Sequence, residues 1–145
     1  MHVGDLIPDL SNAQNWANDK RENPSHLAKV VYFWSVGCPA CHAGQPHLKL
    51  VREKYADRGL CIVAVHQPRG ESERDANRVR SVMAELQITA PCLLDNDHHV
   101  SEAFDLDAVP TYYLFGADGR LKRHAAGGFG VKMMASALEK LFPDA

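Results

Sequence analysis

An apolar run that gives way abruptly to a helical pattern limits the folds open to this chain. Lys29 to Ser35 (KVVYFWS) is β-branched and aromatic without polar alternation, which is typical of a strand covered on both faces, as in a parallel sheet. Gly37 ends the run, and Pro39 suits the first position of a helix, where no backbone donor is needed. Apolar residues then recur at helical spacing to about Ala56. The pattern predicts a buried strand that turns directly into a helix.

The rest of the chain alternates between strand and helix patterns. We expect a strand at 60–65, a helix at 75–86, a short strand at 91–94, one or two helical turns at 100–104, strands at 111–115 and 121–125 around a hairpin turn at 116–119, and a final helix at 131–141. The first half implies parallel crossovers, and the hairpin adds an antiparallel edge. The order therefore predicts an α/β fold with a mixed central sheet flanked by helices, and it excludes sandwiches and bundles.

Length and composition indicate one ordinary globular domain. The chain has 145 residues, 46% of them hydrophobic and 23% charged, which allows a real core in a single domain spanning residues 1–145. Residues 11–25 are polar around Trp16, so residues 1–28 are expected to form a loop-rich extension before a core at 29–142. The net charge of −2 and the absence of a basic run argue against nucleic acid as a partner.

Neither a signal peptide nor a membrane span is predicted. The N-terminus lacks a basic stretch followed by an apolar core. Residues 30–48 carry no Asp, Glu, Lys or Arg, but glycines, prolines and histidines interrupt them, so they are unsuited to hydrocarbon. We expect a soluble, cytoplasmic monomer without an integral membrane segment; an exported protein whose signal has been removed is the alternative.

The sequence Cys38-Pro39-Ala40-Cys41 (CPAC) lies at the predicted junction of strand and helix. Cys38 falls at the helix N-cap, where free backbone N–H groups and the positive end of the helix dipole stabilise a thiolate over a thiol. A lowered pKa makes Cys38 the expected nucleophile at neutral pH. Cys41 lies one helical turn further on, close enough to form a disulfide and release a bound partner. The spacing therefore predicts thiol–disulfide exchange.

Other interpretations of the same cysteines stay open at this point. Cys38 to His42 (CPACH) also matches the covalent c-type haem attachment pattern, although that pattern calls for a mostly helical protein around it. A zinc site would need two more ligands, and no second CxxC or HxxxH accompanies the pair. The candidates for those ligands are Cys61, His66, Cys92 and His42. Two buried cysteines at chance spacing are a further alternative. We expect no metal and no cofactor.

Three segments together resemble thioredoxin-like proteins of the bacterial TlpA/ResA type. They are KVVYFWSVGCPACH, LLDNDHHVSEAFDLDAVPTYYLF and GADGRLKRHAAG, and they cover about residues 29–128. The resemblance implies a thioredoxin fold, with a helix–strand insertion at about 75–94 before the strand that follows Pro110. It also implies that Pro110 is a cis-proline packed against the disulfide and that Val109 offers backbone hydrogen bonds to an extended substrate. Proline opening an apolar strand is itself a common place for a cis bond.

We predict that the rim of the active site and its substrate-binding surface include Pro39, Ala40, Val109, Pro110 and Trp34. The chain departs from the family at three places. Ser35-Val36-Gly37 replaces the Trp that usually precedes the first cysteine, and the buried acid of thioredoxins corresponds to Tyr32. The glutamate that some ResA-type proteins carry three residues after the second cysteine corresponds to Gly44.

The usual proton acceptors for Cys41 are therefore missing. One hypothesis is that His66, at the end of the second strand, or His42 takes their place. The alternative is that water accepts the proton and that both histidines are surface residues.

The expected function is disulfide exchange with protein substrates, in the reducing direction, with an upstream dithiol as electron donor. Thiol peroxidase activity is an alternative, because peroxiredoxins share the fold and Ser35 stands where they need a Thr. A redox-inert binding module or metal chaperone is another. Cys61 and Cys92 are expected to be small buried hydrophobic residues without a redox role.

Overall fold

The strands of the computed structural model form one mixed sheet. The structure describes residues 1–10, 15–18 and 27–143. The strands are β1 (Lys29–Trp34), β2 (Cys61–His66), β3 (Cys92–Leu94), β4 (Thr111–Phe115) and β5 (Leu121–Ala126). Their order across the sheet is β3-β2-β1-β4-β5, with β1, β2 and β3 parallel and both β4 and β5 in antiparallel pairs.

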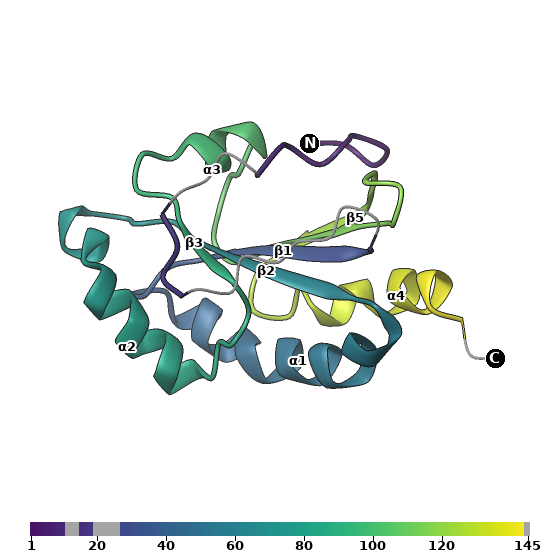
Figure 1. The fold of residues 1–145 in the computed structure, drawn as a ribbon, viewed down its shortest axis with the longest axis horizontal. Coiled ribbons are helices and arrows are strands. Elements are labelled where there is room, and N and C mark those ends of the chain that lie inside the picture. The colour runs from purple at the N-terminus through teal and green to yellow at the C-terminus, as the bar shows by residue number, and fades with distance from the viewer. Residues whose placement is uncertain (11–14, 19–26, 144–145) are drawn as a thin grey trace.

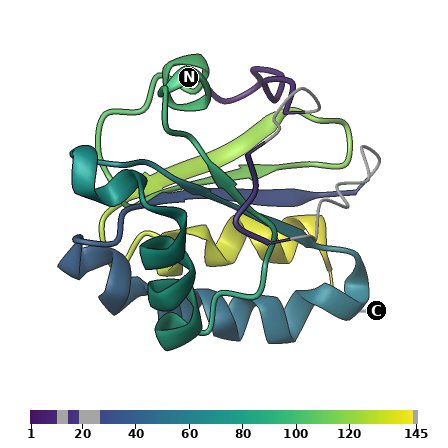
Figure 2. The same ribbon diagram turned by 60° about the vertical axis from the view of Figure 1, so that its left-hand side comes forward.

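Helices cover both faces of the sheet. The α-helices are α1 (Pro39–Tyr55), α2 (Ala76–Leu86), α3 (His99–Ala103) and α4 (Ala135–Leu141), with short 3₁₀ turns at η1 (Ala56–Arg58), η2 (Glu71–Arg74) and η3 (Lys132–Met134). Helices α1, α2 and α4 lie on one side of the sheet, and α3 lies with the N-terminal segment on the other (Figures 1 and 2). Strand β1 is central and leads directly into α1, so its end is where the active-site motif lies.

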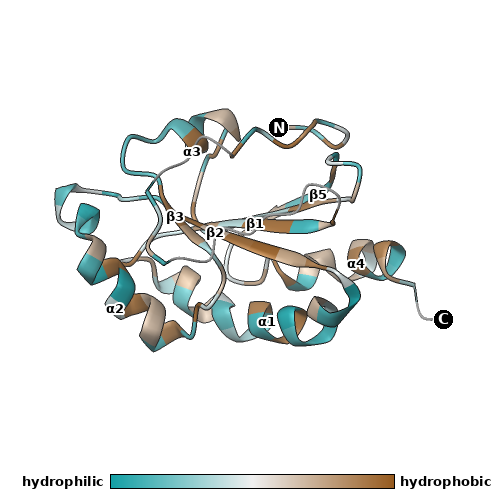
Figure 3. Cartoon of the chain, in the orientation of Figure 1, coloured by the Kyte–Doolittle hydropathy of each residue, from teal (hydrophilic) through white to brown (hydrophobic). Residues whose placement is uncertain are grey.

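The central strand is buried on both faces, as its unbroken apolar pattern predicts. Val30, Tyr32 and Trp34 of β1 belong to the core cluster under α1, α2 and α4, while Val31 and Phe33 belong to the cluster on the opposite face. Hydrophobic and hydrophilic residues are interspersed along the helices, whereas β2 is largely hydrophobic (Figure 3). Two separate cores therefore hold β1 in place from both sides.

The predicted thioredoxin fold is confirmed, and the element boundaries differ by a few residues. The segment between the expected strand at 60–65 and the expected helix at 75–86 contains the turn η2, and the final helix begins with η3 before α4. Helix α2 and strand β3 form the expected insertion between β2 and β4. Of the expected loop-rich extension at 1–28, residues 11–14 and 19–26 lie outside the described residues, whereas Trp16 forms a β-bridge with Leu93. The division into extension and core stays a prediction.

Among the described residues, no helix combines the length and the apolar character needed to cross a membrane.

Candidate active site

Cys38 is the residue on which helix α1 begins. Its backbone is extended (φ −107°, ψ 104°), and its Sγ accepts a hydrogen bond from the Cys41 backbone N–H at 3.1 Å. The first turn of α1 contains no acidic residue. The free N–H groups and the positive end of the dipole therefore act on this sulfur without an opposing carboxylate in that turn. This is the environment that stabilises a thiolate.

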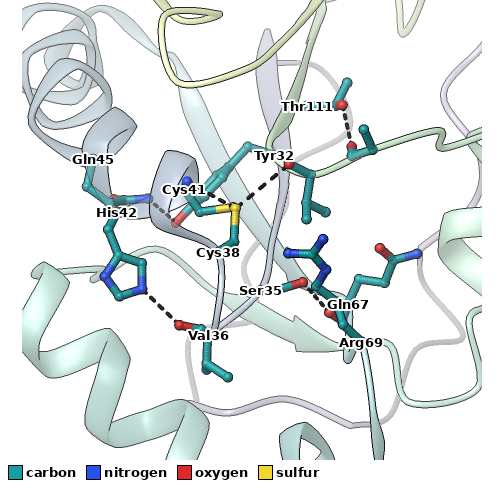
Figure 4. Close-up of a disulfide and its surroundings, with 12 residues drawn as sticks. Tyr32, Ser35, Val36, Cys38, Cys41, His42, Gln45, Gln67, Arg69 and Thr111 are labelled. Atoms are coloured by element: carbon teal, nitrogen blue, oxygen red, sulfur yellow. Dashed lines mark hydrogen bonds between the residues drawn. A yellow bond between two sulfur atoms is a disulfide. The ribbon is translucent and has the colours of Figure 1, made fainter.

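Cys38 and Cys41 are joined by a disulfide, with their Cα atoms 5.2 Å apart (Figure 4). This separation lies in the usual range for a disulfide. The two side chains are nearly buried, at 3% and 1% exposure. The intervening Pro39 and Ala40 are exposed. Pro39 and Ala40 are therefore the accessible part of the motif, and their role in a substrate-binding rim stays a prediction.

The segment before β4 faces the disulfide. The Val109–Pro110 peptide bond is cis, as the resemblance implied, and the Val109 carbonyl oxygen lies 3.7 Å from Cys38 Sγ. Thr111 Oγ1 donates a hydrogen bond to the Ala108 carbonyl at 2.6 Å and closes this turn (Figure 4). Half-buried Val109 is thus held beside the nucleophile, where its backbone can meet an extended chain.

Trp34 does not contribute to the rim, which corrects one prediction. Its side chain is fully buried and packs edge-on against His66, with ring centroids 4.9 Å apart. The reason is the position of Trp34 in the pleat of β1, on the face that α1 and α2 cover. Its role is in the core under the motif.

The two candidate histidines both bind the peptide groups of Val36. The Val36 N–H donates to His66 Nε2 at 3.3 Å, and His42 Nε2 donates to the Val36 carbonyl at 2.9 Å. Ser35 Oγ, next to Val36, donates to the Gln67 carbonyl (Figure 4). The loop before Cys38 is therefore fixed by side chains from α1 and the end of β2.

His66 is neither a surface residue nor suited to be a base at neutral pH. It is fully buried, and burial together with the nearby charge of Arg78 lowers its pKa to about 4. Because Nε2 accepts from Val36, the neutral ring carries its proton on Nδ1, which has no hydrogen-bond partner within the described part of the chain. The expectation that His66 is a surface residue is thus wrong, and its part as a proton acceptor stays a prediction that its low pKa disfavours, whereas its contact with Val36 holds the active-site loop. His42 is half-buried, so it is not a free surface residue either.

A pair of tyrosines lies under the start of α1. Gln45 Nε2 donates to Tyr32 Oη at 3.0 Å, and the Tyr32 ring stacks on that of Tyr112 at a centroid distance of 5.8 Å. Burial raises the pKa of Tyr32 well above its usual value and that of Tyr112 to about 12. Both phenols are therefore neutral at neutral pH.

Tyr112 occupies the space beside Gly44. A Cβ at residue 44 would lie 2.5 Å from Tyr112 Oη and 3.2 Å from the Gly128 carbonyl oxygen. The Tyr112 hydroxyl is buried and has no hydrogen-bond partner in residues 1–10, 15–18 and 27–143. Sequence reasoning missed Tyr112, because only the packing of β4 against α1 brings it to this helix.

Comparison with known proteins places this site in a family. A family model described as Redoxin matches residues 2–141. The chain belongs to the Redoxin family. It is 33% identical over 147 residues to the thiol-disulfide oxidoreductase YkuV of Bacillus subtilis, covering 99% of both chains. It is 28% identical over 144 residues to the thiol-disulfide oxidoreductase ResA of Bacillus subtilis, covering 94% of this chain and 78% of that protein.

A solved structure supports the same assignment. The solution structure of a thioredoxin-like protein in the oxidised form matches with a TM-score of 0.82 and 32% identity, covering 97% of each chain. The predicted TlpA/ResA-type thioredoxin-like class and the assignment as a thiol–disulfide oxidoreductase are confirmed. The roles of the individual site residues stay predictions.

In this Redoxin-family chain, the glycine at position 44 has a steric explanation. We predict that Gly44→Ala lowers the free energy of unfolding by about 2 kcal/mol, because its Cβ would overlap the Tyr112 hydroxyl in a packed core. A loss of stability would be informative, because alanine is intrinsically a better helix former than glycine by about 1 kcal/mol and would otherwise stabilise the helix. Urea denaturation of the purified variant measures the change.

The double variant Gly44→Ala/Tyr112→Phe is expected to recover most of this loss. Removing the hydroxyl leaves Tyr112 Cζ 3.7 Å from the new methyl group, an ordinary contact. Gly70→Ala serves as a matched control, because a Cβ there meets no atom within 4 Å. Wild-type stability in Gly44→Ala, or no recovery in the double variant, would contradict this packing.

The remaining cysteines and the hydroxyl of Ser35 bear on the other interpretations of the site. Cys61 and Cys92 are free thiols, and burial raises the pKa of Cys61, and that of Cys92 to about 12. Within the described ranges, no group of three or more His, Cys, Asp or Glu side chains could hold a metal ion. Ser35 Oγ donates to the Gln67 carbonyl, so this donor is engaged where a peroxidase would need it for peroxide.

Proposed function

We propose that this enzyme reduces disulfide bonds in protein substrates and is itself re-reduced by an external dithiol. The Cys38 thiolate attacks one sulfur of the substrate disulfide, and the other substrate sulfur leaves as a thiolate and takes up a proton. The Cys41 thiolate then attacks Cys38 Sγ, which releases the second substrate thiolate and leaves the Cys38–Cys41 disulfide. The donor dithiol supplies the two electrons that restore both thiols.

One observation carries the proposal: a disulfide whose first sulfur is the N-cap of α1 and faces the Val109 backbone. The N-terminal dipole favours the thiolate on Cys38, which makes it both the better nucleophile and the better leaving group. The Val109 backbone beside it can pair with an extended substrate chain. These features suit a polypeptide disulfide.

The surroundings of Cys41 separate its role from that of Cys38. Its side chain is 1% exposed and lies over the neutral phenol of Tyr32 and the apolar core. A charged sulfur is disfavoured in such surroundings, whereas a disulfide is neutral. Burial therefore keeps Cys41 a neutral thiol in the reduced enzyme, so that Cys38 carries the thiolate that attacks the substrate.

The test is the reduction potential of the Cys38–Cys41 pair, measured by equilibration with a dithiol buffer of known potential. We expect a value close to about −270 mV, which is typical of a reductant, and reduction of a protein disulfide in the presence of excess dithiothreitol. A value close to about −120 mV would reverse the assigned direction. Cysteines that do not cycle at all would refute the function.

A further inference from the structure

Large apolar side chains are exposed next to the active-site motif. Phe129 is 69% exposed and Met133 is 53% exposed, and both belong to the segment after β5. Single exposed apolar residues need no explanation, but two of them in one short segment at an active site do. The site residues described above do not account for them.

This segment is attached to the motif at two points. The Gly127 N–H donates to the Pro110 carbonyl at 2.9 Å, which ties the segment to the cis-proline turn. On the other side, Gly128 lies so close to Ala40 that a Cβ would be 3.3 Å from the Ala40 carbonyl oxygen. Gly127 and Gly128, the two residues before Phe129, therefore lie beside the cis-proline turn and the motif.

The surroundings of Phe129 are basic. Lys132 Nζ lies 5.6 Å from the centre of the Phe129 ring, and the His47 ring lies 6.0 Å away. Arg123 Nε donates to the Met133 carbonyl at 2.8 Å and places another cation at this segment. The sequence contains no Asp or Glu at 29–52 or at 119–138, the stretches that form this side of the site. An acidic segment of a partner therefore meets no carboxylate from these stretches.

We propose that the segment 127–133 is a docking surface that selects protein disulfides whose cysteine is flanked by apolar and acidic residues. The inference rests on the proposed function, because the exchange brings a polypeptide to Cys38. The apolar side chain of the partner packs on Phe129 and Met133, and its carboxylates face Lys132 and Arg123. Burial of an exposed aromatic ring supplies affinity, and the cations supply selectivity and faster association.

Three symmetric peptide disulfides test the surface. Each is a disulfide-linked dimer of a blocked five-residue peptide with a central cysteine: Asp-Leu-Cys-Leu-Asp, Lys-Leu-Cys-Leu-Lys and Asp-Ser-Cys-Ser-Asp. The neutral bis(2-hydroxyethyl) disulfide is the small substrate. For each substrate, the ratio of kcat/KM between variant and wild type cancels the intrinsic reactivity of the disulfide.

We expect Phe129→Ser to lower kcat/KM about tenfold for the two leucine peptides and little for the serine peptide. Lys132→Glu is expected to lower kcat/KM for the acidic leucine peptide and raise it for the lysine peptide. Neither variant should change the rate with bis(2-hydroxyethyl) disulfide. The control is Leu6→Ser, which removes a 59% exposed leucine on the N-terminal segment, on the other side of the sheet.

Three results would contradict the docking surface or the proposed function. An unchanged rate of Phe129→Ser with the leucine peptides, or an equal fall in Leu6→Ser, overturns the docking surface. A parallel fall with the small disulfide overturns it too, because Phe129 would then support the motif itself. If wild-type enzyme turns over none of the four disulfides, the proposed function fails instead.

Discussion

Replacing Cys38 by serine is expected to abolish disulfide exchange, lowering the rate by about a thousandfold or more. The thiolate is the nucleophile, and a serine hydroxyl at the same N-cap is not ionised at neutral pH. Because Cys38 Sγ accepts the Cys41 N–H at this end of α1, serine can keep that hydrogen bond and the fold. Reduction of a protein disulfide by the variant in excess dithiothreitol measures the loss.

Replacing Cys41 by serine is expected to give a different defect. Cys38 still attacks, but the resolving thiol is missing, so a mixed disulfide with the substrate accumulates and is visible by mass spectrometry. Cys61→Ser is the matched control, since this half-buried thiol lies outside the motif and burial raises its pKa. Full activity in Cys38→Ser, or a trapped complex in Cys38→Ser rather than in Cys41→Ser, would reverse the assigned roles.

The sequence predicted the parts of this fold that depend on local pattern. The run from Val30 to Trp34 is apolar at every position because two cores cover β1, and that pattern can be recognised from the sequence alone. Pro39 marks the first residue of α1, which leaves Cys38 as the N-cap. The nucleophile and its partner follow from these two local signals.

The parts that depend on packing could not be predicted. Trp34 and His66 follow the alternation of strands β1 and β2, and both point into the covered face, although a tryptophan and a histidine beside a motif resemble site residues. Gly44 and Tyr112 lie 68 positions apart, and only the close approach of β4 to α1 makes one depend on the other. A single sequence does not reveal such a pair.

The burial of His66 predicts a loss of stability in acid. The unfolded chain binds a proton at His66 below a pKa of about 6.5, whereas the folded protein does so only below about 4. Between these values the unfolded state holds more protons, so the free energy of unfolding falls as the pH falls. The difference in pKa corresponds to about 3 kcal/mol at full effect. This part of the free energy of unfolding is fully present above pH 6.5 and is lost as the pH falls toward 4.

His66→Gln is the variant that isolates this effect. A glutamine Oε1 can accept from the Val36 N–H in place of Nε2 but does not titrate, so the active-site loop is kept and the pH dependence from this residue disappears. Urea denaturation from pH 7 to pH 4 should show a smaller loss of stability in the variant than in the wild type. His47→Gln, on the half-buried outer part of α1, is the control and should retain the wild-type slope.

The exchange rates of two His66 variants separate two roles of this residue in catalysis. If the ring only accepts from Val36, His66→Gln keeps the exchange rate at neutral pH, whereas His66→Leu, which leaves the buried Val36 N–H without an acceptor, lowers it. If the ring were the proton acceptor of Cys41, both variants would lose the rate equally. Equal acid slopes in wild type and His66→Gln would show that the ring is not held neutral. The active-site loop would then have to be fixed by the contacts of Ser35 and His42 alone.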